Sequence, residues 1–208
     1  MRRTLWGRTT SSNVMKVIWL LETLKLPYEQ FDVGGPFGKT DTPEYRAMNP
    51  TGLVPTLQED DFTLWESNAI LRYICNAHAP DTSLWPRDQQ ARAVVDHWLD
   101  AQQTILNRPA STIFLGLVRT PPEQRDTAAI AQAVVDAGRA YGMISEKLAR
   151  TPYICGDALT LADIAWGVHV HRWFVMDIER PDMPALRAWY DRLLELPIYK
   201  EHIARKLV

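Results

Sequence analysis

The sequence predicts a small α/β domain with a mixed sheet, followed by an all-helical domain. Up to about residue 79, short β-type runs alternate with helical patterns, whereas every later periodic segment is helical. Between them, "APDTSLWPRD" holds two prolines and little periodicity, which is typical of a linker. We therefore expect domains at residues 1–79 and 89–208 joined by a linker at residues 80–88, and 208 residues suffice for both cores.

The first domain is expected to run β-α-β and then β-β-α. The segment "TLW" is strand-like, and residues 13–25 repeat apolar side chains at helical spacing. "PYEQFDV" predicts a second strand, and "LVPTLQ" and "FTLWE" predict two more around the turn "EDD". After Glu66, apolar residues again recur at helical spacing. A β-α-β unit implies a parallel pair and the close hairpin an antiparallel one, so the sheet is mixed.

The second domain is expected to contain long amphipathic helices. They span residues 89–116, with a bend at Pro109, and residues 123–148; a third begins in "GDALTLADIAWGV", and a shorter pair covers residues 184–194 and 198–205. Thr160 and Asp163 have the spacing of a capping box, and the helix that follows is apolar on nearly every face. We interpret that pair as a structural cap in a core.

Charge and composition exclude several classes of protein. The formal net charge is −2, with no run of like charges to form a nucleic-acid or anionic-membrane surface. No apolar run reaches the roughly 20 residues of a membrane span, and the N-terminus lacks the pattern of a secretory signal. Cys75 and Cys155 lie far apart outside any metal-binding motif, so we expect reduced thiols, no metal site and a cytoplasmic protein.

Three short segments carry residue types that can bind a ligand. Pro55 opens a predicted strand and donates no backbone hydrogen bond, which leaves a strand edge for an extended ligand; a cis bond before it is rare, at about 5–6%. Glu66 and Ser67 begin a helix whose amides attract a carboxylate, while Glu66 can hold an ammonium group. An N-terminal serine is also an ordinary cap. In "GRTTSSNVMK", four hydroxyls precede the first helix, as turn and cap residues or as chemical groups.

Taken together, "SSNVMKVIWLLE", "NPTGLVPTL", "ESNAILRYI" and "GDALTLADIA" resemble the cytosolic glutathione transferases, in particular their bacterial theta-like and nu-like branch. The order and separation of the motifs match over essentially the whole chain. The resemblance implies a thioredoxin-like N-terminal domain, an all-helical C-terminal domain, glutathione as co-substrate without a metal, and a homodimer. It also implies a cis bond between Val54 and Pro55.

The resemblance assigns glutathione-binding roles to particular residues. The backbone of Val54, before Pro55, would pair with the cysteinyl part of glutathione, and Glu66 and Ser67 would hold its γ-glutamyl end. The glycine carboxylate is less defined, because Thr40 and Leu53 replace the donors of many relatives. Lys39 is the nearest basic substitute there.

The loop before the first helix is where the resemblance places the thiolate-stabilising donor. A thiol with a pKa near 8.5 is mostly protonated at neutral pH, so the enzyme must favour the anion. The resemblance places this donor on Ser11 with Asn13 as helper, while Thr10 and Ser12 remain alternatives. The catalytic tyrosine or cysteine of other classes has no counterpart in this loop.

The second substrate would be a small hydrophobic electrophile bound against the helical domain. Candidate lining residues, by position only, are Arg108, Phe114, His169, Arg172 and Trp173. Conjugation, peroxide reduction and disulfide exchange all remain open. The alternative function is a non-catalytic adaptor of the same fold, which need not retain the Glu66 and Ser67 pair.

Overall fold

The computed structural model describes residues 2–207, and the chain divides into two compact units, Met1–Pro80 and Asp81–Val208. Leu84 and Trp85 are buried, and the Leu84 carbonyl accepts a hydrogen bond from the amide of Leu161. Part of the segment expected as a linker is therefore bonded to the helical unit. Among residues 2–207, no helix has the length and hydropathy needed to cross a membrane.

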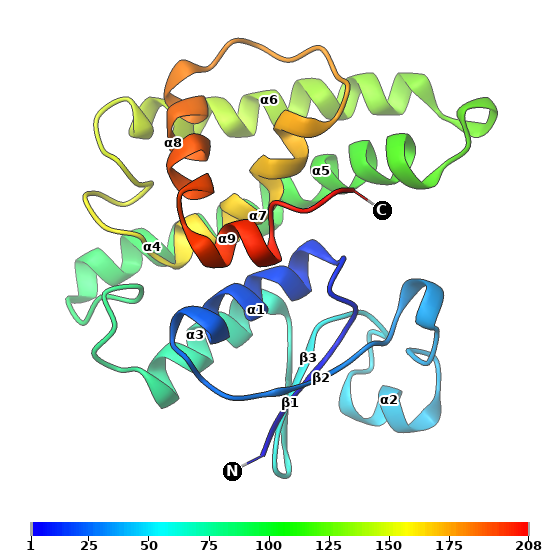
Figure 1. Cartoon of the computed structure of the whole chain (residues 1–208), viewed down its shortest axis with the longest axis vertical. Helices are drawn as coiled ribbons and strands as arrows, with labels where there is room; N and C mark the ends of the chain where they lie inside the picture. Colours follow the sequence, from blue (N-terminus) through cyan, green and yellow to red (C-terminus); the bar gives the residue numbers. More distant parts are fainter. Residues whose placement is uncertain (1, 208) are drawn as a thin grey trace. The chain divides into compact units, whose positions relative to one another are not determined.

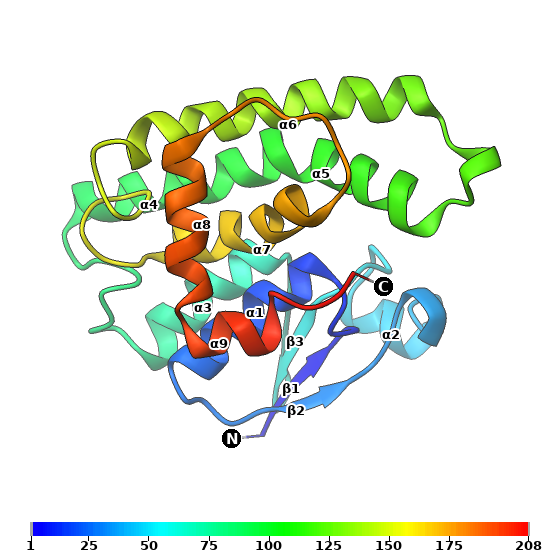
Figure 2. The same cartoon turned by 45° about the horizontal axis from the view of Figure 1, so that its top comes forward.

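The N-terminal unit is built on a four-stranded mixed sheet in the order β2-β1-β3-β4. The strands are β1 Arg3–Trp6, β2 Glu29–Phe31, β3 Thr56–Glu59 and β4 Phe62–Trp65. β1 pairs with β2 in parallel and with β3 in antiparallel, and β3 and β4 form the antiparallel hairpin. This confirms the predicted mixed sheet, which Figure 2 shows. Strands β2, β3 and β4 are shorter than the sequence predicts.

Two amphipathic helices, α1 Ser12–Thr23 and α3 Ser67–His78, lie side by side on one side of this sheet (Figures 1 and 2). Apolar side chains of both helices are fully buried with those of the inner strands: Leu5, Val17, Leu21, Leu57, Ile70 and Ile74. The helical spacing of the apolar residues in the sequence thus does identify the faces that form the core.

The sequence prediction missed two short elements of this unit. The 3₁₀ turn η1 Gly35–Phe37 and the helix α2 Pro43–Met48 follow β2. Thr42 caps α2 by accepting from the Tyr45 amide, and Pro43 occupies the first turn, where its missing N–H costs nothing. Because Tyr45 is the one buried side chain that α2 contributes, no hydrophobic periodicity reveals it.

A buried carboxylate ties α3 to the sheet. Glu59 on β3 accepts from Arg3 Nε at 2.5 Å and from the Tyr73 hydroxyl at 2.6 Å, and its carboxylate lies 2.9 Å from His78 Nε2. Glu59 and Arg3 are both about 4% exposed. Strand β1, strand β3 and the C-terminal half of α3 therefore meet in one polar cluster within the N-terminal unit.

The second unit is helical, as predicted. Its elements are α4 Gln89–Ala101, η2 Gln102–Leu106, α5 Asn107–Phe114, η3 Leu115–Arg119, η4 Pro122–Gln124, α6 Thr127–Leu148, α7 Leu161–Val175, α8 Pro184–Leu194 and α9 Pro197–His202. Figure 1 shows α6 running along α5, and the two helices are in contact.

Three boundaries in this unit differ from the prediction. The helix expected over residues 89–116 is interrupted by the π-helical turn η2, just before Pro109, so the irregular turn lies where the missing amide of proline disturbs the hydrogen-bond ladder. The helix expected from residue 123 begins at Thr127, because Asp126 caps it through the Ala129 amide. The last helix ends at His202, not at residue 205.

The Thr160 and Asp163 pair is a structural cap with a wider role. The Asp163 carboxylate accepts from the amides of Thr160 at 2.9 Å and Ile154 at 3.0 Å, and from Trp189 Nε1 at 3.0 Å. Asp163 is fully buried at the start of α7. It therefore joins the start of α7, the loop before it and α8.

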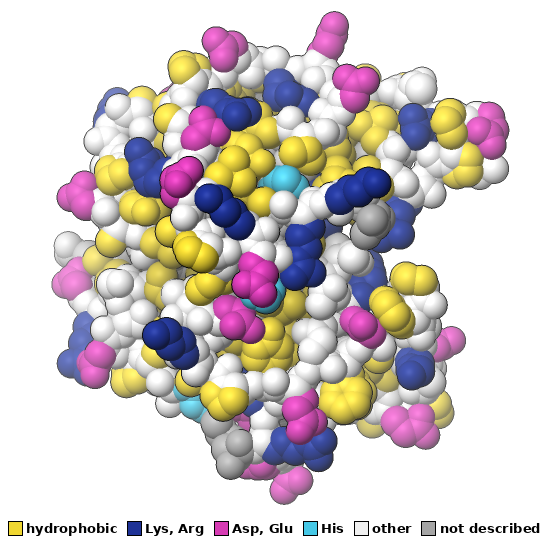
Figure 3. All heavy atoms as spheres, viewed as in Figure 1, with side chains coloured by type: hydrophobic (Ala, Val, Ile, Leu, Met, Phe, Trp, Pro, Cys, Tyr) yellow, Lys and Arg dark blue, Asp and Glu magenta, His cyan; other side chains and the backbone are white. Residues whose placement is uncertain are grey.

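Side chains of both charges are interspersed on the face of the molecule seen in Figure 3.

Candidate functional site

The first part of the candidate site is the loop between β1 and α1. Gly7 has a φ of 150°, and a Cβ atom there would come within 2.5 Å of Val14 Cγ2, so glycine is needed where the loop turns back over the helix. The amide of Ser11 donates to the Arg8 carbonyl, which closes a turn that contains Thr9 and Thr10. α1 then begins at Ser12.

Ser11 is the N-cap residue of α1, yet its hydroxyl makes no capping hydrogen bond. A cap serine ordinarily uses this oxygen to satisfy an amide of the first helical turn. The Ser11 hydroxyl therefore does not serve as the cap of α1. Ser12, by contrast, is buried, at 9% exposed.

A polar cluster joins the N-terminal ends of α1 and α3. The Ser67 hydroxyl donates to Asn13 Oδ1 over a long 3.4 Å, and it accepts from Lys16 Nζ at 3.3 Å. Lys16 Nζ also donates to Asn68 Oδ1 at 3.2 Å. Ser67, Asn68 and Lys16 are buried, and Asn13 is half-buried. The structure thus brings Asn13 and Ser67, which the sequence singled out separately, into one hydrogen-bonded group.

Glu66 is the N-cap residue of α3 and is exposed. Its φ of 70° places it in the left-handed region, which is uncommon for a residue with a Cβ atom and often marks a functional constraint. Its carbonyl accepts from the Ile70 amide, while its side chain does not cap the helix. The carboxylate is therefore available at the same helix end as the Ser67 hydroxyl.

The Val54–Pro55 bond is cis, as the family resemblance implies and against the frequency for such bonds in general. Val54 precedes β3 and lies outside its ladder. The preceding carbonyl, of Leu53, accepts from the Tyr45 hydroxyl at 2.7 Å and from Asn49 Nδ2 at 2.9 Å. A Cβ atom at Gly7 would lie 3.2 Å from Val54 Cβ, so this segment adjoins the loop before α1.

The segment after β2 holds Lys39 and Thr40. Lys39 is exposed with a φ of 68°, and Thr40 is half-buried. A Cβ atom at Gly34 would lie 3.1 Å from Arg8 Nη1, 3.2 Å from Val54 Cγ1 and 3.4 Å from Thr40 Cγ2. The guanidinium of Arg8 therefore lies beside Thr40 and Val54. Sequence reasoning missed Arg8, although a basic residue two positions after the first strand was the available signal.

The residues proposed for the second substrate all belong to the helical unit. The Arg172 guanidinium lies 3.8 Å from the centre of the Phe114 ring, and His169 Nε2 lies 3.2 Å from Gln102 Nε2. His169, Arg172 and Trp173 share the lining of a cavity of about 10 Å³, while Arg108 is exposed. A cavity of this size holds at most one water molecule. The assignment of these residues to the second substrate stays a prediction.

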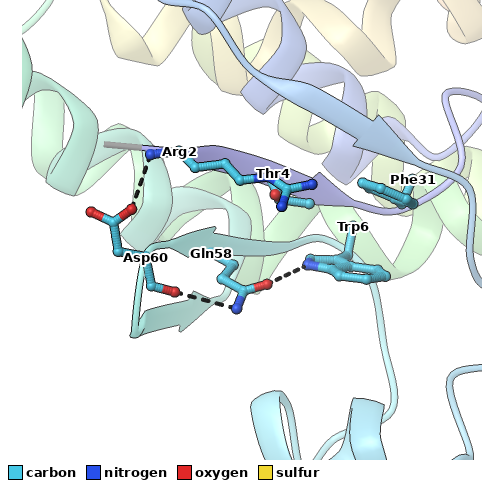
Figure 4. Close-up of a pocket in the computed structure, with 6 residues that line it drawn as sticks. All are labelled: Arg2, Thr4, Trp6, Phe31, Gln58 and Asp60. Carbon is cyan, nitrogen blue, oxygen red and sulfur yellow. Dashed lines mark hydrogen bonds between the residues drawn. The ribbon is translucent and has the colours of Figure 1, made fainter.

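A separate hollow of about 270 Å³ lies on the sheet of the N-terminal unit (Figure 4). It is lined by Arg2, Thr4, Trp6, Phe31, Gln58 and Asp60. Its polar groups bond mostly to one another: Gln58 accepts from Trp6 Nε1, and the Arg2 amide donates to Asp60. It shares no residue with the Ser11 and Ser67 cluster.

The cysteines are not placed for nucleophilic chemistry. Both thiols are free, and burial raises the pKa of each, Cys75 and Cys155, to about 12. A thiol with so high a pKa carries almost no thiolate at neutral pH. Within residues 2–207, no three His, Cys, Asp or Glu side chains gather as metal ligands would.

Comparisons with known proteins match both parts of the chain to one family. Residues 1–76 match the family model "Glutathione S-transferase, N-terminal domain", and residues 127–192 match "Glutathione S-transferase, C-terminal domain". The glutathione S-transferase GstB of Escherichia coli K12 is 39% identical over 95% of this chain and 96% of its own. Glutathione S-transferase 1 of Manduca sexta is 30% identical over 95% of this chain and 90% of its own.

Among solved structures, the theta class glutathione S-transferase of Xanthomonas axonopodis pv. citri with glutathione bound superposes with a TM-score of 0.94. It is 42% identical, and the match covers 99% of both chains. Glutathione transferase F2 of Populus trichocarpa, at 22% identity and a TM-score of 0.87, shares the fold.

Proposed function

The chain belongs to the glutathione S-transferase family, and from this premise we propose that it binds glutathione on the N-terminal unit and transfers it to a small hydrophobic electrophile. The observation that carries the proposal is the cluster at the N-terminal ends of α1 and α3. There, the uncommitted Ser11 hydroxyl, Asn13, Glu66 and Ser67 lie on two adjoining helices.

Glu66 and Ser67 are proposed to hold the γ-glutamyl end of glutathione. The amides and positive dipole end of α3 attract its carboxylate, and the Ser67 hydroxyl adds a donor. The exposed Glu66 carboxylate complements the ammonium group. The carboxylate of the ligand then meets the positive end of α3, and its ammonium group meets the Glu66 carboxylate at the same helix end.

The cysteinyl part and the glycine carboxylate of glutathione are proposed to bind along the segment before β3 and near it. The backbone of Val54, outside the strand ladder, pairs with the extended cysteinyl part in the manner of an added strand. Thr40 with Lys39 is proposed for the glycine carboxylate. Arg8 is a second cation for it, because its guanidinium lies beside Thr40 and Val54.

Ser11 and Asn13 are proposed to stabilise the thiolate. The Ser11 hydroxyl donates to sulfur, and the amides of the first turn of α1 add their dipoles. Asn13 Oδ1 lies 3.4 Å from the Ser67 hydroxyl oxygen, and the Nδ2 group of Asn13 is proposed as a second donor to sulfur. Each unit by which these groups lower the thiol pKa corresponds to about 1.4 kcal/mol.

The reaction then needs no nucleophile from the protein. The thiol proton leaves to solvent, the sulfur anion attacks the electrophilic carbon, a sulfur–carbon bond forms, and the leaving group departs with its electron pair. The theta class relative is described with glutathione bound, which supports glutathione as this chain's co-substrate.

Retention on immobilised glutathione followed by three activity assays tests the proposal. We expect retention, and conjugation with an activated aryl halide; assays with an organic peroxide and with a mixed glutathione disulfide show which reaction dominates. A protein that neither binds glutathione nor turns over any of the three substrates would contradict the proposal.

We also propose a homodimer, in keeping with the family. Light scattering after size-exclusion chromatography tests this directly. A mass near 48 kDa, about twice that of the 23.8 kDa chain, is expected, and the mass of one chain at all concentrations would contradict it.

A further inference from the structure

Lys16 is a buried basic residue beside the residues proposed to bind glutathione. It lies on α1, one helical turn after Asn13, and its side chain is fully buried. Burying an ammonium group is costly unless a partner compensates its charge. Such a residue beside a ligand site is a candidate for a part in binding.

The contacts of Lys16 lead to the γ-glutamyl site. Its Nζ donates to Ser67 Oγ at 3.3 Å and to Asn68 Oδ1 at 3.2 Å, at the first two positions of α3. Because the Ser67 oxygen accepts from Lys16, its own proton is directed to Asn13 Oδ1 or to a ligand. One ammonium group thus sets the orientation of the hydroxyl at the head of α3.

We infer that Lys16 is a positioning residue of the γ-glutamyl site, which provides positive charge behind Ser67 and takes up a proton when the ligand carboxylate binds. The inference rests on the proposed glutathione site. Glu66 complements the ammonium group of the ligand, and Lys16 complements its carboxylate. The zwitterionic end of the ligand is then matched by a charge pair across the end of α3.

The protonation of Lys16 is sensitive to a new charge. Burial lowers the pKa of the Lys16 ammonium group to about 7, and the charge of Glu66 acts in the opposite direction. A carboxylate placed at Ser67 adds negative charge and so raises this pKa. The other titratable side chains of α3 and of the four strands are Arg72, Tyr73, Cys75, His78, Arg3, Glu29 and Glu59. Of these, Arg3, Tyr73 and His78 bond to Glu59, and Glu29 pairs with Arg2.

Calorimetric titration with S-methylglutathione tests the inference, because this ligand has no thiol proton to release. Titrations in phosphate and in Tris, whose ionisation heats differ, give the number of protons exchanged. We expect uptake of a large fraction of a proton at about pH 8 and almost none at about pH 6, where Lys16 is already charged. Wild-type binding without uptake at about pH 8 would overturn the inference and leave the proposed function intact, whereas no binding at all would overturn both.

Three variants separate the charge from the packing. Lys16→Met is expected to bind about tenfold or more weakly at about pH 6 and to lose the proton uptake. Lys16→Arg keeps a permanent charge, so it should bind well without uptake. Lys25→Met, at an exposed lysine just beyond the same helix, is the matched control and should behave as wild type. Uptake that persists in Lys16→Met would overturn the inference, and the wild-type measurement decides the question even where a variant fails to fold.

Discussion

Ser67 connects two roles proposed for this site, binding of the γ-glutamyl end and stabilisation of the thiolate. Its hydroxyl bonds to Asn13 on one side and to Lys16 on the other. Its position at the head of α3 places it for the γ-glutamyl carboxylate. Asn13 belongs to the group proposed for sulfur. Substitutions here should therefore separate binding from thiol ionisation.

Ser67→Ala is expected to weaken glutathione binding about tenfold, because a hydrogen bond to a charged group is worth about 1.5–3 kcal/mol. The pKa of the bound thiol should change much less, since the Ser11 hydroxyl and the α1 amides remain. Equilibrium dialysis gives the affinity, and ultraviolet absorbance of the thiolate gives the ionisation. Unchanged affinity would contradict the place assigned to Ser67.

Arg8 and Lys39 offer alternative partners for the glycine carboxylate. Arg8 lies beside Thr40 and Val54, while Lys39 is exposed on the turn before Thr40. We expect Arg8→Gln to raise the KM for glutathione several-fold and Lys39→Gln to raise it less. Arg8 is half-buried and Lys39 is exposed, so solvent screens the attraction between Arg8 and a carboxylate less strongly. A larger effect at Lys39 would reverse the assignment.

At the scale of elements, each unit has a buried carboxylate that holds its helices in place. Glu59 fixes α3 to the sheet of the N-terminal unit, and Asp163 joins α7, α8 and the loop before α7 in the helical unit. Their titration behaviour differs because their partners differ.

Glu59→Gln is expected to destabilise the protein by about 3–5 kcal/mol at neutral pH, the range for breaking a buried ion pair. Burial alone would raise the pKa of Glu59, but the hydrogen bonds of Tyr73, His78 and Arg3 together hold it below its ordinary 4.5. A carboxyl with a lowered pKa stabilises the fold above its unfolded pKa, and this contribution is lost as the pH falls through the folded pKa.

Urea denaturation of wild type and Glu59→Gln across the acid range measures this effect. The difference in unfolding free energy should shrink below about pH 4. Asp61→Asn, at an exposed carboxyl in the neighbouring turn, is the control and should leave stability nearly unchanged. A difference that is independent of pH would contradict the proposed charge network.

Asp163→Ala is expected to lower the unfolding free energy by about 3 kcal/mol or more, since it removes a cap and leaves buried donors of Ile154 and Trp189 unpaired. Burial raises the pKa of Asp163 to about 6, against the opposing effect of its hydrogen bonds. Chemical denaturation, with Asp157→Ala as an exposed control, checks the prediction. An equal effect of both substitutions would contradict it.

The elements that the sequence predicts well are those with a buried periodic face. α1, α3 and α7 follow from their apolar spacing, and the capping pair at Thr160 and Asp163 follows from its own spacing. α2 does not, because it contributes a single buried side chain. The π-helical turns on either side of Pro109 depend on how the backbone hydrogen bonds of the helix rearrange around the missing proline amide. The spacing of apolar residues does not reveal this rearrangement.

At the scale of the whole molecule, the fold and the family follow from several weak motifs in the right order, whereas the details of the site depend on packing between helices. Glu66 and Ser67 are visible in the sequence as a helix start. The contact of Lys16 with Ser67 is not, because it joins residues 51 positions apart across two helices. Likewise, the position of Arg8 beside Thr40 depends on the close approach of glycine backbone at Gly34.

The most direct test of the account is the ionisation of glutathione bound to wild type and to Ser11→Ala, followed by thiolate absorbance against pH. We predict that the bound thiol of wild type titrates well below its ordinary pKa of about 8.5 and that Ser11→Ala raises this pKa by about one unit or more. Thr10→Ala and Ser12→Ala, as matched controls, should leave it nearly unchanged. An unaltered thiol pKa in Ser11→Ala, or a shift confined to one of the two control variants, would contradict the central claim that Ser11 stabilises the thiolate.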